Sequence, residues 1–328
     1  MNFELSLGFD DVAIKQQKNI CKSRLDVDIS SEIIKGVKVK IPLIAANMSS
    51  VINSNFLIEI MRLGAFGFLH RALPDEEYFQ QVHAVAKESK WVPVSIGVGE
   101  SQYLLAKKLI SEGANVVLID VAHGYADTVI ELGRRLKKEY PHIKMVVGNT
   151  TNIGLLQETC DFADAVKVGI GQGSACETKD MAGSTEKQFT AVLQFKEISR
   201  AYGIPVISDG GIRVPGDFSK AIGAGAMSAM CGSIFARCPE SAAEHIYDSQ
   251  NGHQKVYFGM ASRRSQDNWK GGLKPGTCSE GKVVHLPMGQ PVEDLLERYA
   301  GGLRSGITYG GGKDIKSFQQ SVQFVRFK

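Results

Sequence analysis

Asn115-Val116-Val117-Leu118-Ile119 is a short apolar run, and Lys144-Met145-Val146-Val147 is a second one. Between them, Tyr125 to Glu139 carries apolar residues at three- and four-residue intervals among Lys, Arg and Glu, which is the pattern of an amphipathic helix. The two runs are apolar throughout rather than alternating, as is typical of strands that are buried on both faces. This part of the chain therefore predicts two parallel strands joined by a helix that covers them.

The same unit recurs along the chain. Six further apolar runs are Lys40 to Ala45, Ala65 to Leu69, Val92 to Val98, Ala165 to Val168, Pro205 to Ser208 and Ala226 to Cys231. Eight strand-helix units in about the first 250 residues are typical of an α/β fold, the TIM (β/α)8 barrel, whereas a doubly wound sheet usually has fewer strands and a GxGxxG turn. We predict one TIM-barrel catalytic domain over residues 1–328, with the tail Gly252 to Lys328 closing over the barrel and residues 252–282 forming a mobile flap.

Composition excludes several classes of protein. The 328 residues include 38 Lys and Arg against 35 Asp and Glu, which leaves a net charge of +3 and argues against nucleic-acid or membrane-surface partners. No apolar run approaches the roughly 18 residues of a membrane helix, and the N-terminus lacks the pattern of a signal peptide. The six cysteines show no CxxC spacing and are too sparse for a disulfide framework. We expect a cytoplasmic protein.

Polar residues and glycines follow the predicted strands, where a TIM barrel places its active site. They are Asn47, His70, Arg71, Gly97, Gly99, Asp120, Asn149, residues 169–178, Asp209 to Gly211, Gly232 and Ser233. The loops after the seventh and eighth strands commonly bind phosphate in this fold, because backbone N–H groups converge there. Each glycine alone is equally compatible with a tight turn, but Gly210-Gly211 and Gly232 together predict an anionic ligand. Asp209 beside a phosphate suits a ribose diol, which indicates a nucleotide.

The sixth predicted strand leads into the most informative loop, Lys167-Val168-Gly169-Ile170-Gly171-Gln172-Gly173-Ser174-Ala175-Cys176-Glu177-Thr178. Its alternating glycines allow the backbone to fold tightly and to expose Cys176 at the barrel mouth. A cysteine in such a loop can act as a covalent nucleophile. Cys21, Cys160 and Cys238 lack this context and are interpreted as packed side chains.

At this loop the chain resembles the IMP dehydrogenase/GMP reductase family, whose fingerprint has the form GxGSxCxT. The resemblance spans nearly the whole chain through collinear motifs: Ser23 to Asp28, Ala45 to Met48, Ile119 to Gly124, Gly148-Asn149, the cysteine loop, Ser208 to Gly211, Gly259 to Ser262, Ser279 to Lys282 and Gly302 to Ser305. The family fold implied by this resemblance is again a TIM barrel.

Within the family, the resemblance favours the reductase branch. The chain has no room for regulatory CBS modules between Leu73 and Val92, and Met260 to Glu280 lacks the Arg-Tyr pair with which the dehydrogenases activate water. The segment Cys278 to Lys282 matches the reductase pattern. The resemblance thus implies an NADPH-dependent oxidoreductase that converts GMP to IMP and ammonia. Two alternatives stay open: an IMP dehydrogenase without CBS domains that converts IMP to XMP with NAD, and a catalytically silent purine-nucleotide-binding relative, which Glu177 beside the cysteine allows.

The resemblance also implies residue roles. Cys176 would attack C2 of the guanine ring, and Thr178 and Glu280 would handle the proton of the departing ammonia. Phosphate contacts are implied for Ser174, Gly211, Gly232, Ser233 and Tyr257, a ribose contact for Asp209, base contacts for Gly259 and Met260, nicotinamide contacts for Asp120, Asn149 and Gly169, and a K⁺ site for the carbonyls of Gly171, Gly173 and Cys176. The family further implies a homotetramer.

Overall fold

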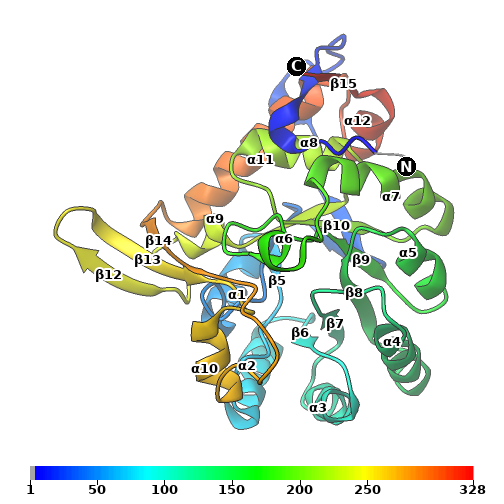
Figure 1. The fold of residues 1–328 in the computed structure, drawn as a ribbon. Coiled ribbons are helices and arrows are strands. Elements are labelled where there is room, and N and C mark those ends of the chain that lie inside the picture. Colours follow the sequence, from blue (N-terminus) through cyan, green and yellow to red (C-terminus); the bar gives the residue numbers. More distant parts are fainter. Residues whose placement is uncertain (1–3, 328) are drawn as a thin grey trace.

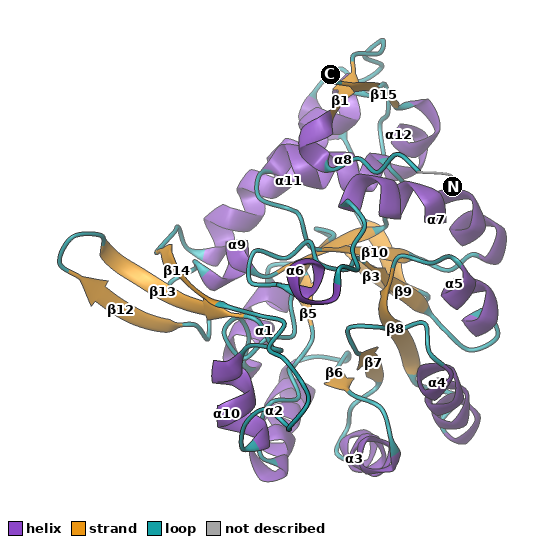
Figure 2. Cartoon of the chain, viewed as in Figure 1, coloured by secondary structure: helices purple, strands orange, loops and turns teal. Residues whose placement is uncertain are grey.

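Eight parallel strands form a barrel with helices on its outside (Figures 1 and 2). The structure is a computed structural model that describes residues 4–327. The strands are β4 (Leu43–Ala45), β5 (Phe66–Gly67), β6 (Pro93–Ile96), β7 (Val116–Asp120), β8 (Lys144–Thr150), β9 (Ala165–Val168), β10 (Val206–Asp209) and β11 (Ser228–Cys231). Neighbouring strands pair in parallel from β5 through β4 and β11 back to β6. The barrel closes between β5 and β6, where Leu69 bridges Val94 and the Ser95 amide donates to the Leu69 carbonyl at 3.1 Å.

Helices cover the outer face of this barrel. They are α1 (Ser54–Arg62), α2 (Asp75–Glu88), α3 (Glu100–Ser111), α4 (Asp127–Glu139), α5 (Gly154–Thr159), α7 (Gln188–Tyr202), α8 (Pro215–Gly223) and α11 (Val292–Tyr309). Shorter helices are η1 (Phe9–Asp11), η2 (Arg24–Asp26), α6 (Thr178–Ala182), α9 (Ser233–Ala236) and α12 (Ile315–Ser321). None of the described helices is long and apolar enough to cross a membrane.

The end of the barrel opposite the cysteine loop is closed by a hairpin of β2 (Ser31–Ile34) and β3 (Val37–Val39). Ile33, Ile34 and Val37 are fully buried and pack in one cluster with barrel-interior side chains such as Phe66 and Val116. Elsewhere, β1 (Val12–Lys15) pairs in antiparallel register with β15 (Gln323–Arg326), so segments near the two ends of the chain lie side by side. Because the hairpin packs against the barrel interior, we expect the active site at the C-terminal mouth of the barrel, where this fold places it.

A second structural unit follows the last barrel strand. The strands β12 (Glu244–Asp248), β13 (Gly252–Phe258) and β14 (Val283–Pro287) form an antiparallel sheet, and β12 and β13 extend away from the barrel (Figure 1). Between β13 and β14 lie α10 (Arg263–Lys270) and a loop of residues 271–282. The Ser262 side chain begins α10 by accepting the Ser265 amide at 3.3 Å. The predicted flap thus consists of one strand, one helix and a return loop.

The predicted TIM barrel is confirmed, with two corrections. The first predicted strand, Lys40 to Ala45, begins only at Leu43, because Pro42 has no N–H to donate to a ladder. The eighth strand-helix unit is also not complete by residue 250: α9 has only four residues, and the helix that packs beside α8 to complete the barrel wall is α11. The tail that we expected to lie over the barrel therefore supplies part of the barrel itself.

Candidate active site

A cavity of about 390 Å³ opens at the C-terminal mouth of the barrel. Its wall includes residues from the ends of most barrel strands, from the cysteine loop and from the flap: Asn47, Met48, Arg71, Asp120, Asn149, Lys167, residues 169–173, Cys176, Thr178, Asp209, Gly210, Gly232, Tyr257, residues 259–261, Gln266, Trp269 and Glu280. This volume lies within the usual range of small-molecule sites. The structure therefore gathers most of the predicted site residues around one space.

Cys176, Thr178 and Glu280 form a chain of hydrogen bonds on one side of the cavity. The Thr178 hydroxyl lies 3.3 Å from the Cys176 sulfur and donates to Glu280 Oε2 at 2.8 Å. A hydroxyl carries a single hydrogen, so while Thr178 donates to the carboxylate, it accepts the thiol hydrogen of Cys176. The chain is thus oriented to carry a proton from the sulfur to Glu280.

Backbone contacts hold the flap on the cysteine loop. The Glu177 amide donates to the Glu280 carbonyl at 2.8 Å, and the Lys282 amide donates to the Ala175 carbonyl at 3.1 Å. The two segments approach so closely that a Cβ atom at Gly259 would lie 2.7 Å from the Ala175 oxygen. A glycine is required at that position, because a side chain would separate the segments. Glu280 reaches the cysteine because of this close contact.

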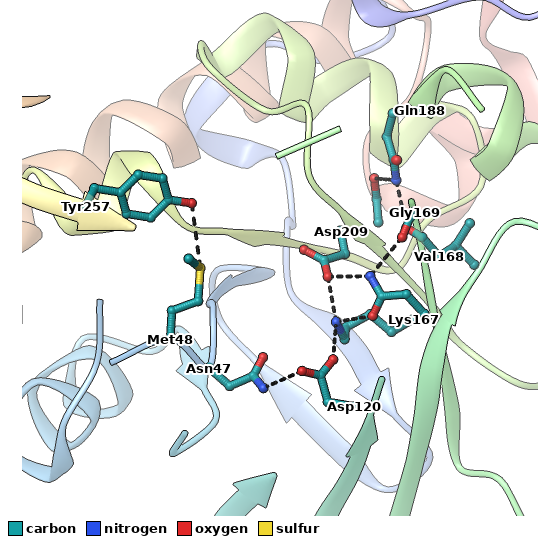
Figure 3. A network of polar contacts seen from close by, with 11 residues as sticks. Asn47, Met48, Asp120, Lys167, Val168, Gly169, Gln188, Asp209 and Tyr257 are labelled. Carbon is teal, nitrogen blue, oxygen red and sulfur yellow. Dashed lines mark hydrogen bonds and ion pairs between the residues drawn. The ribbon is translucent and has the colours of Figure 1, made fainter. Parts of the chain in front are cut away.

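The cavity wall also holds a network of polar side chains around a buried lysine (Figure 3). Lys167 on β9 lies at its centre, with Nζ 2.8 Å from Asp120 Oδ1 and 2.6 Å from Asp209 Oδ2. Lys167 also donates to the Asn149 side-chain oxygen, and the Asn149 amide nitrogen donates to Asp209 and to the Gly169 carbonyl, at 2.8 Å in both cases. Asn47 donates to Asp120 at 2.9 Å. Four barrel strands therefore contribute to one network.

The charges of this network are mutually stabilising. Burial alone would raise the pKa of Asp120, but the charges of Lys167 and Arg71 outweigh burial and lower it. Burial would likewise lower the pKa of Lys167, but the two carboxylates and their hydrogen bonds raise it. Asp120 is therefore ionised and Lys167 protonated at neutral pH.

The residues predicted to bind phosphate are divided between the cavity wall and its surroundings. Gly232 and Tyr257 line the cavity, and a Cβ atom at Gly232 would overlap the Tyr257 hydroxyl. Ser174, Gly211 and Ser233 are each adjacent in sequence to a residue of the described wall rather than part of it. Their role in phosphate binding stays a prediction.

The remaining predicted residues lie close to the cysteine. Gly259 and Met260 line the cavity on the flap side, and the Ser49 hydroxyl lies 3.9 Å from the Met260 sulfur. The backbone carbonyl of Gly173 accepts the Cys176 amide at 3.0 Å, which leaves this oxygen with a free lone pair. Gly173 and Cys176 thus lie in one tight turn, Gly171 lies two residues before it, and the K⁺ site on the three carbonyls stays a prediction.

Two features of the site were not predicted from the sequence. No role was assigned to Lys167, although a lysine within the apolar run Ala165 to Val168 was a recognisable signal, because a buried lysine needs partners. The contact of the Arg71 guanidinium with the Trp269 ring, at 5.2 Å from the ring centre, was not predicted either. It joins the barrel to α10 of the flap and could not be foreseen from two residues so distant in sequence.

The other cysteines differ from Cys176 in exposure. Cys231 and Cys238 are buried, and burial raises the pKa of both thiols. Cys21 and Cys160 are partly buried, Cys278 is exposed, and all six cysteines are free of disulfides. Of these cysteines, Cys176 alone lines the cavity as its described residues define it.

Comparison with known proteins agrees with this site. Residues 6–328 match the model of the IMP dehydrogenase / GMP reductase domain. A GMP reductase of Klebsiella pneumoniae subsp. pneumoniae is 32% identical over 332 residues, covering 98% of this chain and 95% of its own length. GMP reductases of Onchocerca volvulus and Caenorhabditis elegans are each 30% identical, covering 98% of this chain and 91% and 92% of their own lengths. The full-length match, the barrel and the cysteine loop together show that this chain belongs to the IMP dehydrogenase/GMP reductase family of oxidoreductases.

Proposed function

We propose that this protein is an NADPH-dependent GMP reductase, which converts GMP to IMP and ammonia through a covalent bond between Cys176 and the purine. The observation that carries the proposal is the hydrogen-bonded chain from the Cys176 sulfur through Thr178 to Glu280. Deamination of guanine requires a nucleophile at C2 and a proton for the leaving amine. This chain offers both at one place.

The proton balance of deamination suits this arrangement. The Cys176 sulfur forms a bond to C2 of GMP, and its thiol proton passes through the Thr178 hydroxyl to the Glu280 carboxylate. The C2–N bond then breaks as the same proton returns through Thr178 to the amine, which leaves as ammonia. The proton lost by the thiol is thus the proton that the leaving group needs, and no outside acid is required.

Substrate binding is assigned to the loops beside this chain. The ribose hydroxyls would donate to Asp209, which lies on the cavity wall. The phosphate would bind at Gly232 and Tyr257 and at the neighbouring Ser174, Gly211 and Ser233. Gly259 and Met260 would contact the base edge, which positions C2 near the sulfur.

The described residues also fit a nicotinamide cofactor next to the purine. The cavity wall also carries the Trp269 ring and the half-buried Arg71 guanidinium. An aromatic surface suits a planar ring, and a cation suits a phosphate. Asp120, Asn149 and Gly169 would orient the carboxamide. When bound, NADPH supplies the hydride that converts the covalent purine to IMP.

Further parts of the proposal follow the family. K⁺ would bind to the carbonyls of Gly171, Gly173 and Cys176, because hard oxygen ligands suit alkali cations. We further propose that the protein acts in the cytoplasm as a homotetramer. Size-exclusion chromatography with light scattering tests the tetramer, and activity with and without K⁺ tests the cation site.

The reaction itself is tested by absorbance at 340 nm in two mixtures. GMP with NADPH should lose absorbance, and IMP with NAD should gain none in steady state. Sustained NADH formation in the second mixture would instead identify an IMP dehydrogenase. Nucleotide binding without turnover in either mixture would identify a silent relative.

A further inference from the structure

Lys167 is the most enclosed charged group of the cavity. Its side chain is only 3% exposed, whereas the carboxylates of Asp120 and Asp209 that it contacts are 22% and 20% exposed. Its three polar partners come from three different strands, Asp120 from β7, Asn149 from β8 and Asp209 from β10. Figure 3 shows the ammonium lying between Asp120 and Asp209. One cation thus contacts two of the acidic residues that line the cavity, Asp120 and Asp209.

Under the proposed function, on which this inference rests, those two carboxylates serve different ligands. Asp209 receives the ribose of the purine nucleotide, and Asp120 faces the nicotinamide. We propose that Lys167 is a positioning residue shared by the two subsites, whose ammonium holds both carboxylates in the orientation that their ligands require. A single ammonium group then positions one residue of the mononucleotide site and one residue of the cofactor site.

Stability alone is a weak reason for this lysine. Burying a charged pair costs desolvation free energy, and an apolar side chain in its place is often as stable or more stable. Ala165 lies two residues before Lys167, on the same face of β9, and is fully buried and apolar, so an apolar side chain would also suit this face of the strand. An arrangement that orients carboxylates toward a cavity needs the cation, whereas a packed barrel does not.

Lys167 is also unsuited to direct acid-base or nucleophilic chemistry. A lysine that acts as a base or nucleophile has a lowered pKa, usually because it is buried without a counter-ion. Here the two carboxylates raise the pKa of Lys167 instead, so its amine keeps its proton. Its contribution is therefore made through the residues that it holds.

Asp120 gives the role a pH signature. The charged and polar groups that face it are Lys167, Arg71 and Asn47, and all three lower its pKa. An Asp with a lowered pKa keeps its charge above that pKa and loses it as pH falls through it. Removal of Lys167 raises this pKa, so protonation of Asp120 begins at higher pH.

The test is to titrate IMP and NADP⁺ separately into the full-length protein by calorimetry. Lys167→Met should weaken the binding of both ligands by about tenfold or more, the scale of lost charge-assisted hydrogen bonds. Lys167→Arg, which keeps the charge, should restore most of both affinities. NADP⁺ binding by Lys167→Met should also fall more steeply between pH 7 and 5.5 than wild-type binding does, because the phosphate of the ligand titrates equally in both experiments.

Lys137→Met is the matched control. The Lys137 Nζ lies 2.7 Å from Asp164 Oδ2, and neither residue belongs to the described cavity wall. This variant should change neither affinity nor the pH dependence. Wild-type affinity for both ligands in Lys167→Met, or the loss of only one, would overturn the shared role. So would a failure of Lys167→Arg to restore binding.

A double-mutant cycle keeps the inference testable if Lys167→Met alone does not fold. Asp209→Asn combined with Lys167→Met removes one charge of each sign, and it should bind IMP no more weakly than Asp209→Asn does. A further loss of about tenfold or more in the double variant, relative to Asp209→Asn, would contradict the inference. Failure of the proposed function is distinguishable, because a wild type that binds IMP but does not reduce GMP contradicts the function and leaves these binding tests intact.

Discussion

The hydrogen-bonded chain from Cys176 to Glu280 leads to a prediction about which chemical step each residue serves. Among the described residues, Thr178 is the one whose side chain forms a hydrogen bond to the Cys176 sulfur, at 3.3 Å, and the same hydroxyl donates to Glu280 at 2.8 Å. Thr178→Val removes both contacts with little change in shape. Glu280→Gln keeps a polar group in place but cannot store the proton.

The expected magnitude follows from the role of a single acid-base group. Its loss slows a proton-dependent step by about 10² to 10⁴, or about 3 to 5 kcal/mol of activation free energy. Release of ammonia from GMP needs that proton, so both variants should show a loss of this size in GMP turnover. Hydride transfer itself moves no proton, and in the direction from IMP the Cys176 thiol can lose its proton to solvent instead of Glu280, so this step should be affected less than about tenfold.

The assay separates the two steps. GMP turnover is measured as ammonia released, and the hydride step is measured in the opposite direction as a single-turnover burst of NADPH from IMP and NADP⁺. Thr185→Val is the control, because Thr185 lies in the loop that follows α6 and its hydroxyl contacts Ile170 and Gln172 instead of the sulfur. Equal loss in both steps would show that Thr178 and Glu280 position the purine rather than move its proton, and no loss in either would exclude the pair from the mechanism.

Further predictions concern the nucleophile, the phosphate loop and acid stability. Cys176→Ala should abolish turnover and keep GMP affinity within about tenfold. Cys231→Ala, at a buried position off the cavity wall, is the control and should stay active. Turnover by Cys176→Ala would exclude covalent catalysis. Gly232→Val should displace Tyr257 and weaken GMP binding at least tenfold, measured by calorimetry; equal wild-type affinity for guanosine and GMP would contradict the phosphate assignment. Burial lowers the pKa of His70 from 6.5 to about 4, so the unfolded state binds a proton at higher pH than the folded state does. The protein should therefore lose about 2 kcal/mol of unfolding free energy between pH 7 and 4.5, measured by urea denaturation. His70→Asn should reduce this loss.

The barrel was predictable because its signal is local. Strands buried on both faces are mostly apolar, and the predicted run Ala165 to Val168 coincides with β9. The predicted helix Tyr125 to Glu139 likewise contains α4, which begins at Asp127. The helix that completes the barrel was misplaced, because α11 follows the flap and no local pattern states which helix packs beside α8. Order along the chain does not determine order around the barrel at that point.

The candidate site likewise has a part that local sequence predicted and a part that depends on the fold. Cys176 and Thr178 are two residues apart, and their loop identified them. Glu280 lies about a hundred residues away, and only its resemblance to a family motif connected it to them before the structure showed the contact. Lys167 had a local signal, a charge in a buried strand, but its partners on β7 and β10 are set by strand order in the closed barrel. Long-range pairs of this kind require the fold.

The most direct test of covalent catalysis is the intact mass of the protein after acid quench during turnover. Attack of Cys176 on GMP with loss of ammonia, and attack on IMP with loss of hydride and a proton, should give one and the same adduct mass. We predict this mass in wild-type samples from both mixtures, GMP alone and IMP with NADP⁺, and its absence from Cys176→Ala. Wild-type turnover with no adduct from either mixture, or an adduct that persists in Cys176→Ala, would contradict the proposed mechanism.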